Sequence, residues 1–194
     1  MTASAAPAIP FTLNDIDIAA RVFEALIADA GSAAPRPLAP ADLLAQARAL
    51  HPRDAALARA VALGLGPKLA LIAAFCQQHS YPNLAALAAH PVAGNPAAPV
   101  GDFAGVDWSK APAQWASASK TWRAAVPARL KPRGERPADV AWYAWFRSHR
   151  PACAQVTPEG KQEIINLVMA GLDPETALAR VLAAQAEYGV SAAA

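Results

Sequence analysis

Between Trp108 and Arg150 the chain concentrates the residue types that bind polyanions. This segment holds all five tryptophans and nine of the seventeen lysine and arginine residues, against only two acidic residues. Cationic side chains neutralise phosphates and aromatic rings stack on bases, so the combination is typical of a nucleic-acid surface. The tryptophans are Trp108, Trp115, Trp122, Trp142 and Trp145.

Charge is segregated along the chain in three blocks. Residues 108–150 carry a net charge of +7, whereas residues 1–107 carry −2 and residues 151–194 carry −3. Such segregation predicts something about partners rather than about fold. We expect phosphate contacts from six side chains of the basic block: Lys120, Arg123, Arg129, Lys131, Arg133 and Arg136.

The tryptophans allow two interpretations, because a ring can stack on a base or anchor a core. Trp115 and Trp122 lie nearly two helical turns apart and would share one face of a helix. Tryptophan at helical spacing more often packs in a core. Both interpretations hold together if the rings lie inside and the basic side chains lie outside.

Other candidate chemistry is sparse. Cys76 and His79 have the spacing of two metal ligands on one helix face, but zinc usually takes four ligands and no second pair follows. Cys76 also falls on an apolar stripe, which favours a buried thiol. The sequence has no nucleophile elbow, no phosphate-binding glycine loop and no paired acids at a catalytic spacing. We therefore expect a protein that is not an enzyme and uses no cofactor and no metal.

The elements that must position these residues are predicted to be mainly α-helical, because alanine is abundant and β-branched residues are few. Periodicity and capping signals predict helices at 12–30, 40–50, after Asp54, at 67–78 and at 138–149. Thr157-Pro158 and Asp173-Pro174 each mark the start of one helix of a C-terminal hairpin. Two short strands are expected, at 83–90 and at 100–103.

The first half of the chain resembles a known module. The residues that carry the resemblance are Leu65-Gly66-Pro67, Ile72, Phe75-Cys76, Pro82-Asn83-Leu84, Leu87, Gly94, Pro96, Gly101 and Phe103. Over about residues 12–107 this pattern resembles a winged helix-turn-helix module of uncharacterised bacterial proteins. Its order is also similar to the DNA-binding subdomain of alkylguanine-DNA alkyltransferases and alkyltransferase-like proteins.

The resemblance implies an N-terminal winged helix-turn-helix with a small β-hairpin, and DNA binding. It does not imply alkyl transfer, because Ala89 precedes His90 where that chemistry needs a reactive cysteine beside a histidine. In a winged helix the recognition helix enters the major groove. The side chains then expected to contact DNA are Lys68, Gln77, Gln78 and His79 on helix 67–78, with Arg53 and Arg59 beside it. The alternative is that these residues only decorate a surface.

We expect four parts in the chain. They are a disordered lead at 1–11, a winged-helix-like domain at 12–107, a basic aromatic segment and linker at 108–136, and a helical domain at 137–190. The linker is centred on the proline-rich, basic stretch 127–137 and is expected to be mobile.

The location is expected to be the bacterial cytoplasm. No apolar run reaches the roughly 18 to 20 residues that span a bilayer, the first ten residues do not resemble a signal peptide, and the two cysteines lack a disulfide framework.

The expected function is that of a non-enzymatic DNA-binding protein, either a regulator or an accessory factor of a mobile element or defence system. Duplex DNA is the expected partner, with no membrane. The alternative is a protein-interaction subunit of a larger, possibly RNA-containing complex, in which a degenerate winged helix serves as scaffold.

Overall fold

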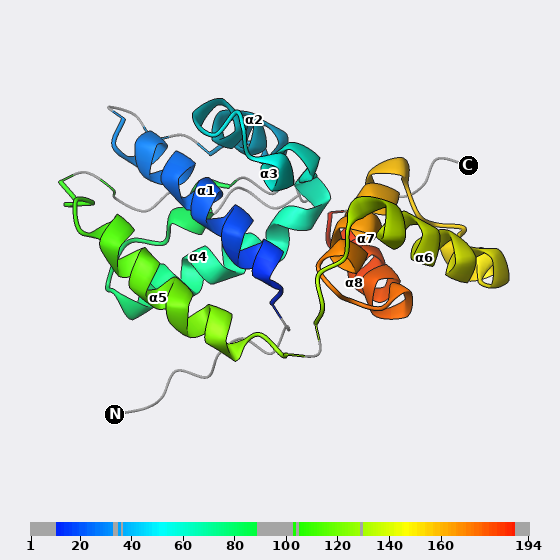
Figure 1. Ribbon diagram of the computed structural model, residues 1–194. Helices are drawn as coiled ribbons and strands as arrows, with labels where there is room; N and C mark the ends of the chain where they lie inside the picture. The colour runs from blue at the N-terminus through cyan, green and yellow to red at the C-terminus, as the bar shows by residue number, and fades with distance from the viewer. Residues whose placement is uncertain are drawn as a thin grey trace.

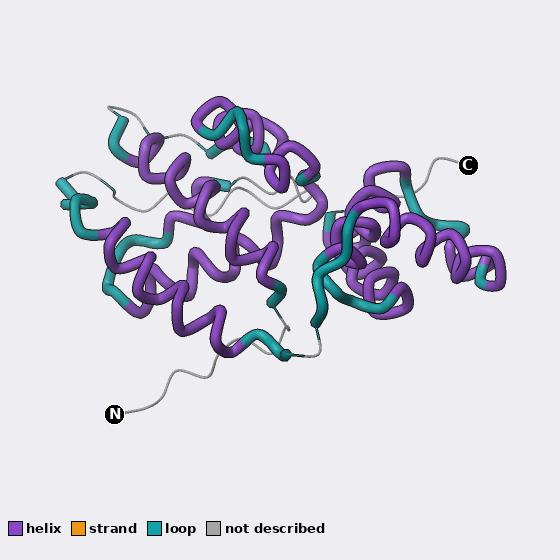
Figure 2. Tube along the Cα trace, in the orientation of Figure 1, coloured by secondary structure: helices purple, strands orange, loops and turns teal. Residues whose placement is uncertain are grey.

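The computed structural model describes residues 11–32, 35, 37–88, 103, 105–128 and 130–188. Within these ranges the chain forms eight α-helices and no strand (Figures 1 and 2), which confirms the expectation of a mainly α-helical protein. The helices are α1 Leu13–Ala30, α2 Pro40–Leu50, α3 Ala55–Arg59, α4 Gly66–Gln78, α5 Ala111–Ala125, α6 Glu135–Ser148, α7 Pro158–Met169 and α8 Pro174–Glu187.

Four predicted helix starts, those of α1, α3, α7 and α8, are confirmed, because a capping side chain makes a hydrogen bond at each. Thr12 and Asp15 form a reciprocal capping box at the start of α1. Asp54, Thr157 and Asp173 each accept a hydrogen bond from the backbone N–H three residues further on, at the starts of α3, α7 and α8. These local signals fix where the elements begin.

The first expected strand, 83–90, is wrong over its described residues. Leu84–Leu87 forms a short 3₁₀ helix, η2, and the Asn83 side chain accepts a hydrogen bond from the Ala85 N–H. Alanine is a weak strand former, and a spacing of three buries both Leu84 and Leu87. Extended pairing is limited to one isolated parallel bridge between Leu38 and Ala88 in the described part of the chain. Most of the expected hairpin, at 89–102, lies outside the described residues.

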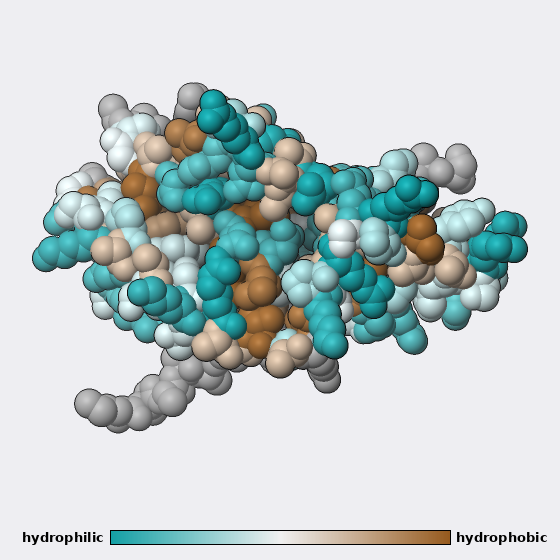
Figure 3. Space-filling view, in the orientation of Figure 1, coloured by the Kyte–Doolittle hydropathy of each residue, from teal (hydrophilic) through white to brown (hydrophobic). Residues whose placement is uncertain are grey.

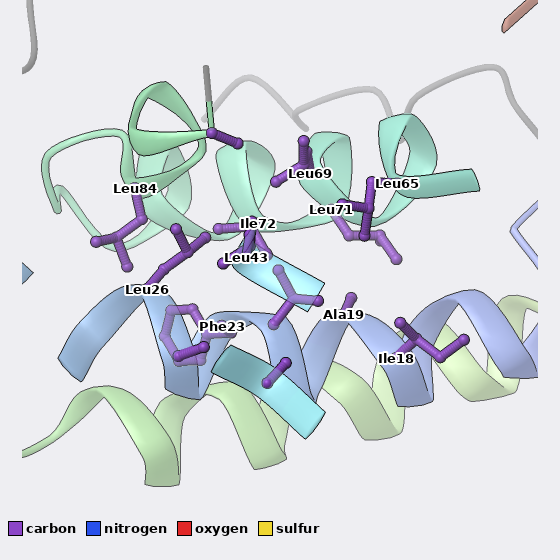
Figure 4. Packing of buried hydrophobic residues seen from close by; sticks show 14 of the residues in the cluster. Ile18, Ala19, Phe23, Leu26, Leu43, Leu65, Leu69, Leu71, Ile72 and Leu84 are labelled. Carbon is purple, nitrogen blue, oxygen red and sulfur yellow. The ribbon is translucent and has the colours of Figure 1, made fainter. Parts of the chain in front are cut away.

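Helix α1 is the centre of the first hydrophobic cluster, against which α2, α4, α5 and η2 pack. Phe23 lies in the middle of its buried face. Its ring centroid is 5.0 Å from that of Phe75 on α4 and 4.4 Å from that of Trp115 on α5. Figure 4 shows the aliphatic side chains of this cluster converging between α1 and α4. Helix α5 thus belongs with the N-terminal helices by its packing.

Helices α6, α7 and α8 form a second cluster, which lies beside the first (Figure 1). Trp142 of α6 packs there with Ile164 and Val168 of α7. Leu63, from the 3₁₀ helix η1 at Ala62–Leu65, inserts into this cluster, although Ala60 and Leu65 belong to the first one. The partition into separate domains stays a prediction.

The segment between α5 and α6 packs against the turn between α7 and α8. The Arg133 N–H donates a 2.7 Å hydrogen bond to the Met169 carbonyl. Gly171, with φ +104°, lies so close that a Cβ there would be 2.7 Å from the Lys131 nitrogen. Helix α6 begins at Glu135, three residues before the expected start, because Gly134 and Pro137 fit its first turn.

Candidate nucleic-acid interface

The basic side chains of the 108–150 segment lie at the surface. The eight that the structure describes are all exposed, namely Lys110, Lys120, Arg123, Lys131, Arg133, Arg136, Arg147 and Arg150, whereas Arg129 lies outside the described residues. Arg123 forms an ion pair with Asp17 of α1. The other seven have no ion-pair partner among the described residues.

The tryptophan rings of the same segment lie in the two clusters. Trp115 and Trp142 are buried, and Trp108, Trp122 and Trp145 are half-buried. Trp115 and Trp122 make an edge-on contact with ring centroids 5.2 Å apart, as their spacing predicts. The tryptophan rings therefore pack at least partly inside, whereas the described basic side chains lie outside.

A shallow groove of about 270 Å³ lies where the two clusters meet. It is lined by Leu13, Asn14 and Asp17 of α1, Ala56 and Arg59 of α3, Pro132 and Arg133, and Asn166, Met169 and Ala170 at the end of α7. Figure 3 shows hydrophilic residues on both sides of the central junction in this view. The groove brings together two arginines that are far apart in the sequence, Arg59 and Arg133.

Neither groove arginine is neutralised in the described structure. The guanidinium groups of Arg59 and Arg133 have no hydrogen-bond or ion-pair partner among the described residues. The acid in the groove, Asp17, already pairs with Arg123. The groove therefore offers two uncompensated positive charges at a concave surface.

The prediction that Lys68 contacts DNA is wrong. Its side chain is only 2% exposed, and its Nζ lies 2.8 Å from Asp15 Oδ1 and 3.4 Å from Glu163 Oε1. Helix α4 lies inside the first cluster, so its residues are exposed only at its C-terminal end, at Gln77 and Gln78. A covered helix cannot lie along the major groove.

The remaining predicted contacts are dispersed. Arg53 is exposed in the turn before α3. His79 is half-buried, with its ring centroid 4.6 Å from that of Phe75. The structure thus brings Arg59 and Arg133 to one groove together with Asp17, whereas Arg53 and the residues at the end of α4 do not line it.

A buried ionic network, which sequence reasoning missed, lies beneath the groove. We use this name for Asp15, Lys68, Glu163 and Arg180. The Arg180 guanidinium donates to both carboxylate oxygens of Asp15, at 3.0 and 2.9 Å. Asp15 and Lys68 lie on helices of the first cluster, and Glu163 and Arg180 lie on helices of the second. The network therefore joins the two clusters.

Asn166 connects this network to the groove. Its Nδ2 donates to Glu163 Oε2 at 3.2 Å and to the Arg59 carbonyl at 3.0 Å. The Glu159 carboxylate also accepts a hydrogen bond from the Leu63 N–H at 3.1 Å. The position of Arg59 in the groove thus depends on α7 and, through it, on the buried charges.

The network favours the charged forms of Asp15 and Lys68. Burial alone would raise the pKa of Asp15, but the positive charges of Lys68 and Arg180 outweigh it and hold that pKa well below its ordinary value. Burial alone would lower the pKa of Lys68, but the carboxylates of Asp15 and Glu163 outweigh it and raise that pKa. Two positive and two negative charges therefore balance inside the protein.

The space around the network is filled. A Cβ built on Gly64 would lie 2.4 Å from the Glu163 carboxylate. A side chain at position 64 would therefore displace the Glu163 carboxylate from its contacts with Lys68 and Asn166. None of these four residues lines the groove.

The described residues show no site for a metal ion. Cys76 is fully buried in the first cluster, and burial raises the pKa of its thiol, as expected for a structural cysteine. No group of three or more histidine, cysteine or acidic side chains is positioned to hold a metal within the described ranges. Among the described helices, none has the length and apolar character to cross a membrane.

Comparison of the chain with protein-family models, with curated proteins and with solved structures finds no match. The resemblance to winged-helix modules therefore stays a prediction.

Proposed function

We propose that this protein binds nucleic acid through the phosphate backbone and performs no chemistry on it. The proposed surface consists of Lys120, Arg123, Lys131, Arg133 and Arg136, with Arg59 in the groove and Arg129 in the same segment. One observation carries the proposal: seven of the eight described basic residues between 108 and 150 are exposed without an acidic partner. Exposed unpaired cations gain free energy on phosphate because counterions are released.

The groove supports a phosphate contact rather than a buried ligand. Its volume of about 270 Å³ is below the range of roughly 300–1,000 Å³ that ligand pockets usually have. Arginine presents a planar fork of donors that matches phosphate oxygens. Arg59 and Arg133 would approach one phosphate from opposite walls of the groove, which fixes how a strand lies on the surface.

Recognition of a particular base sequence would be weak. With Lys68 buried, the base-reading candidates are reduced to Gln77, Gln78 and His79 at the end of α4, with Arg53 apart from them. The winged-helix interpretation of residues 12–107 expects hairpin strands at 83–90 and 100–103, and the phosphate surface does not depend on them. Duplex DNA is the proposed partner, and the role is that of a regulator or an accessory factor of a mobile element or defence system.

The covered position of α4 favours one rival function. A winged-helix-like scaffold without an exposed recognition helix can serve as a subunit of a larger complex, possibly one that contains RNA. On that view the same basic surface docks an acidic protein. A competition experiment distinguishes the two functions, because excess unlabelled duplex DNA displaces labelled DNA from a nucleic-acid site.

Fluorescence anisotropy with labelled duplex DNA, titrated at several salt concentrations, tests the proposal. The test variant is Arg59→Gln with Arg133→Gln, and the matched control is Lys110→Gln with Lys161→Gln, which removes the same charge away from the groove. We expect the groove variant to bind more weakly, with a log–log salt slope smaller by about 1.8 for two lost phosphate contacts. The control should change the affinity less.

A variant with Arg129, Lys131, Arg133 and Arg136 changed to alanine should lose most of its binding. Absence of binding by the unchanged protein even at low salt would refute the proposal. Equal loss in the groove and control variants would refute the role of the groove and leave only general attraction by net charge.

A further inference from the structure

Tyr143 in the 108–150 segment presents its ring to solvent, whereas the exposed His149 ring stacks on Trp145. Tyr143 on α6 is 60% exposed, whereas the tryptophans and Phe146 pack at least partly in the clusters. Val140, one turn earlier, is also 60% exposed. Tyr143 is therefore a described aromatic residue that can take the stacking role that the sequence suggests for the tryptophans.

Tyr143 and Val140 belong to a stripe on the outer face of α6. Arg136, Val140, Tyr143 and Arg147 follow one another at spacings of four, three and four residues, so their side chains lie along one side of the helix. The buried residues Ala138 and Trp142 lie on the opposite side, against α7. Helix α6 runs outward from α7 and α8 in Figure 1. We call this stripe the outer face of α6.

The outer face is basic at both ends and apolar in the middle. Arg136 and Arg147 have no ion-pair partner among the described residues and are separated by about 16 Å along the helix axis. Asp139 lies at the edge of the stripe, and Glu135 lies in the first helical turn, where the helix dipole favours an acid. Arg150 extends the positive charge beyond Arg147.

We propose that the outer face of α6 binds an unpaired nucleic-acid strand, with a base stacked on Tyr143 against Val140 and phosphates on Arg136 and Arg147. Cations that follow the backbone, combined with an exposed ring, are the usual means of holding single strands. Base-paired duplex offers no free base face to the ring. This inference rests on the proposed nucleic-acid function and adds a preference for strands with unpaired bases.

A second copy of this chain does not fit the same face. Antiparallel pairing of two α6 helices about Val140 and Tyr143 places Arg136 of each copy opposite Arg147 of the other. Parallel pairing places each arginine opposite itself. Both arrangements bring like charges together, which is unfavourable. A polyanion matches the charge of the face.

Anisotropy measured with labelled oligothymidine and, in parallel, with labelled duplex DNA tests the inference on the full chain. The test variant is Tyr143→Ala, with Tyr143→Phe to retain the ring and Leu50→Ala to remove an exposed apolar side chain on α2. We expect Tyr143→Ala to weaken oligothymidine binding by about 5- to 150-fold and duplex binding by less than about twofold. Tyr143→Phe and Leu50→Ala should stay close to the unchanged protein. Thermal unfolding checks that every variant folds.

The outcomes separate this inference from the proposed function. If duplex and oligothymidine both bind and Tyr143→Ala changes neither affinity, the outer face of α6 is not a strand-binding site, while the phosphate surface stands. If Tyr143→Ala weakens both probes equally, the preference for unpaired bases is refuted. If the unchanged protein binds neither probe, both proposals fail.

Discussion

Lys68 and Arg133 carry the same charge and have opposite surroundings. Lys68 is buried with two carboxylates within 3.4 Å, and Arg133 is exposed in the groove without an acidic partner among the described residues. A buried charge is tolerated only when it is paired, so Lys68 is fixed to one arrangement of helices. An exposed unpaired charge remains available to a polyanion. Positively charged side chains thus serve two purposes, stability in the buried network and binding at the basic surface.

The largest difference between the two regions should appear in unfolding. Lys68→Met leaves Asp15 and Glu163 buried with only Arg180 opposite them, and should lower the free energy of unfolding by about 3–5 kcal/mol. Arg133→Met should change it by less than about 0.5 kcal/mol, as is usual for surface positions. Urea denaturation followed by circular dichroism measures both. Equal effects would mean that the buried network contributes no more than the surface.

Acid should weaken the buried network before it affects the basic surface. The pKa of Asp15 is depressed in the folded protein, so its contribution is present above the unfolded value of about 3.9 and is lost as the pH falls below it. The raised pKa of Lys68 contributes stability below about pH 10.4, which is lost as the pH rises through the folded value. Stability at low ionic strength should therefore fall below about pH 4.

Asp15→Asn isolates this effect, because it keeps the shape and removes the charge. Denaturant unfolding at a series of pH values should show a flatter acid limb in the variant than in the unchanged protein. An acid limb of the same steepness in both would assign the loss to other carboxylates.

A smaller effect is expected from filling the space beside the network. Gly64→Ala puts a Cβ 2.4 Å from the Glu163 carboxylate and should cost about 1–3 kcal/mol. Gly31→Ala is the control, since a Cβ there makes only ordinary van der Waals contact, 3.5 Å from the Ile27 carbonyl, and the φ of Gly31 is −79°. It should be neutral or stabilise slightly. Thermal unfolding compares them, and a stable Gly64→Ala protein would show that the Glu163 carboxylate can move aside without loss.

The smallest effect on stability, with a measurable effect on binding, is expected at Lys131. Lys131→Gln should leave the melting temperature nearly unchanged and reduce the salt slope of DNA binding by about 0.9. Parallel melting and anisotropy series measure the two quantities. A clear loss of stability would show that Lys131 belongs with the structural charges, since its backbone packs close to Gly171.

Local features of the fold are readable from the sequence, and long-range ones are not. Thr12, Asp54, Thr157 and Asp173 predict helix starts because a cap depends on residues three positions away. The partners of Lys68 and Asp15 are separated in sequence by as many as 165 residues, and no spacing rule relates them. Lys68 was therefore expected at the surface.

One signal for the buried network is present in the sequence. Lys68 is the only charge within the apolar run 65–76, and Glu163 directly precedes Ile164-Ile165. A single charge next to apolar residues is rarely buried unless it is paired. Two such charges of opposite sign therefore indicate that they pair with each other. The basic surface, in contrast, can be predicted from the composition alone. The proximity of Arg59 to this surface in the groove can be seen only in the folded structure.

The residues of the ionic network are also synthesised in a fixed order. Asp15 leaves the ribosome 165 residues before Arg180, an interval of between about 8 and about 33 s at ordinary elongation rates. During that time α1 to α5 can assemble around Phe23, with the Asp15–Lys68 pair still reached by water. Arrival of α7 and α8 excludes that water and supplies Glu163 and Arg180. The nascent chain thus carries two solvated charges until its last helices close over them.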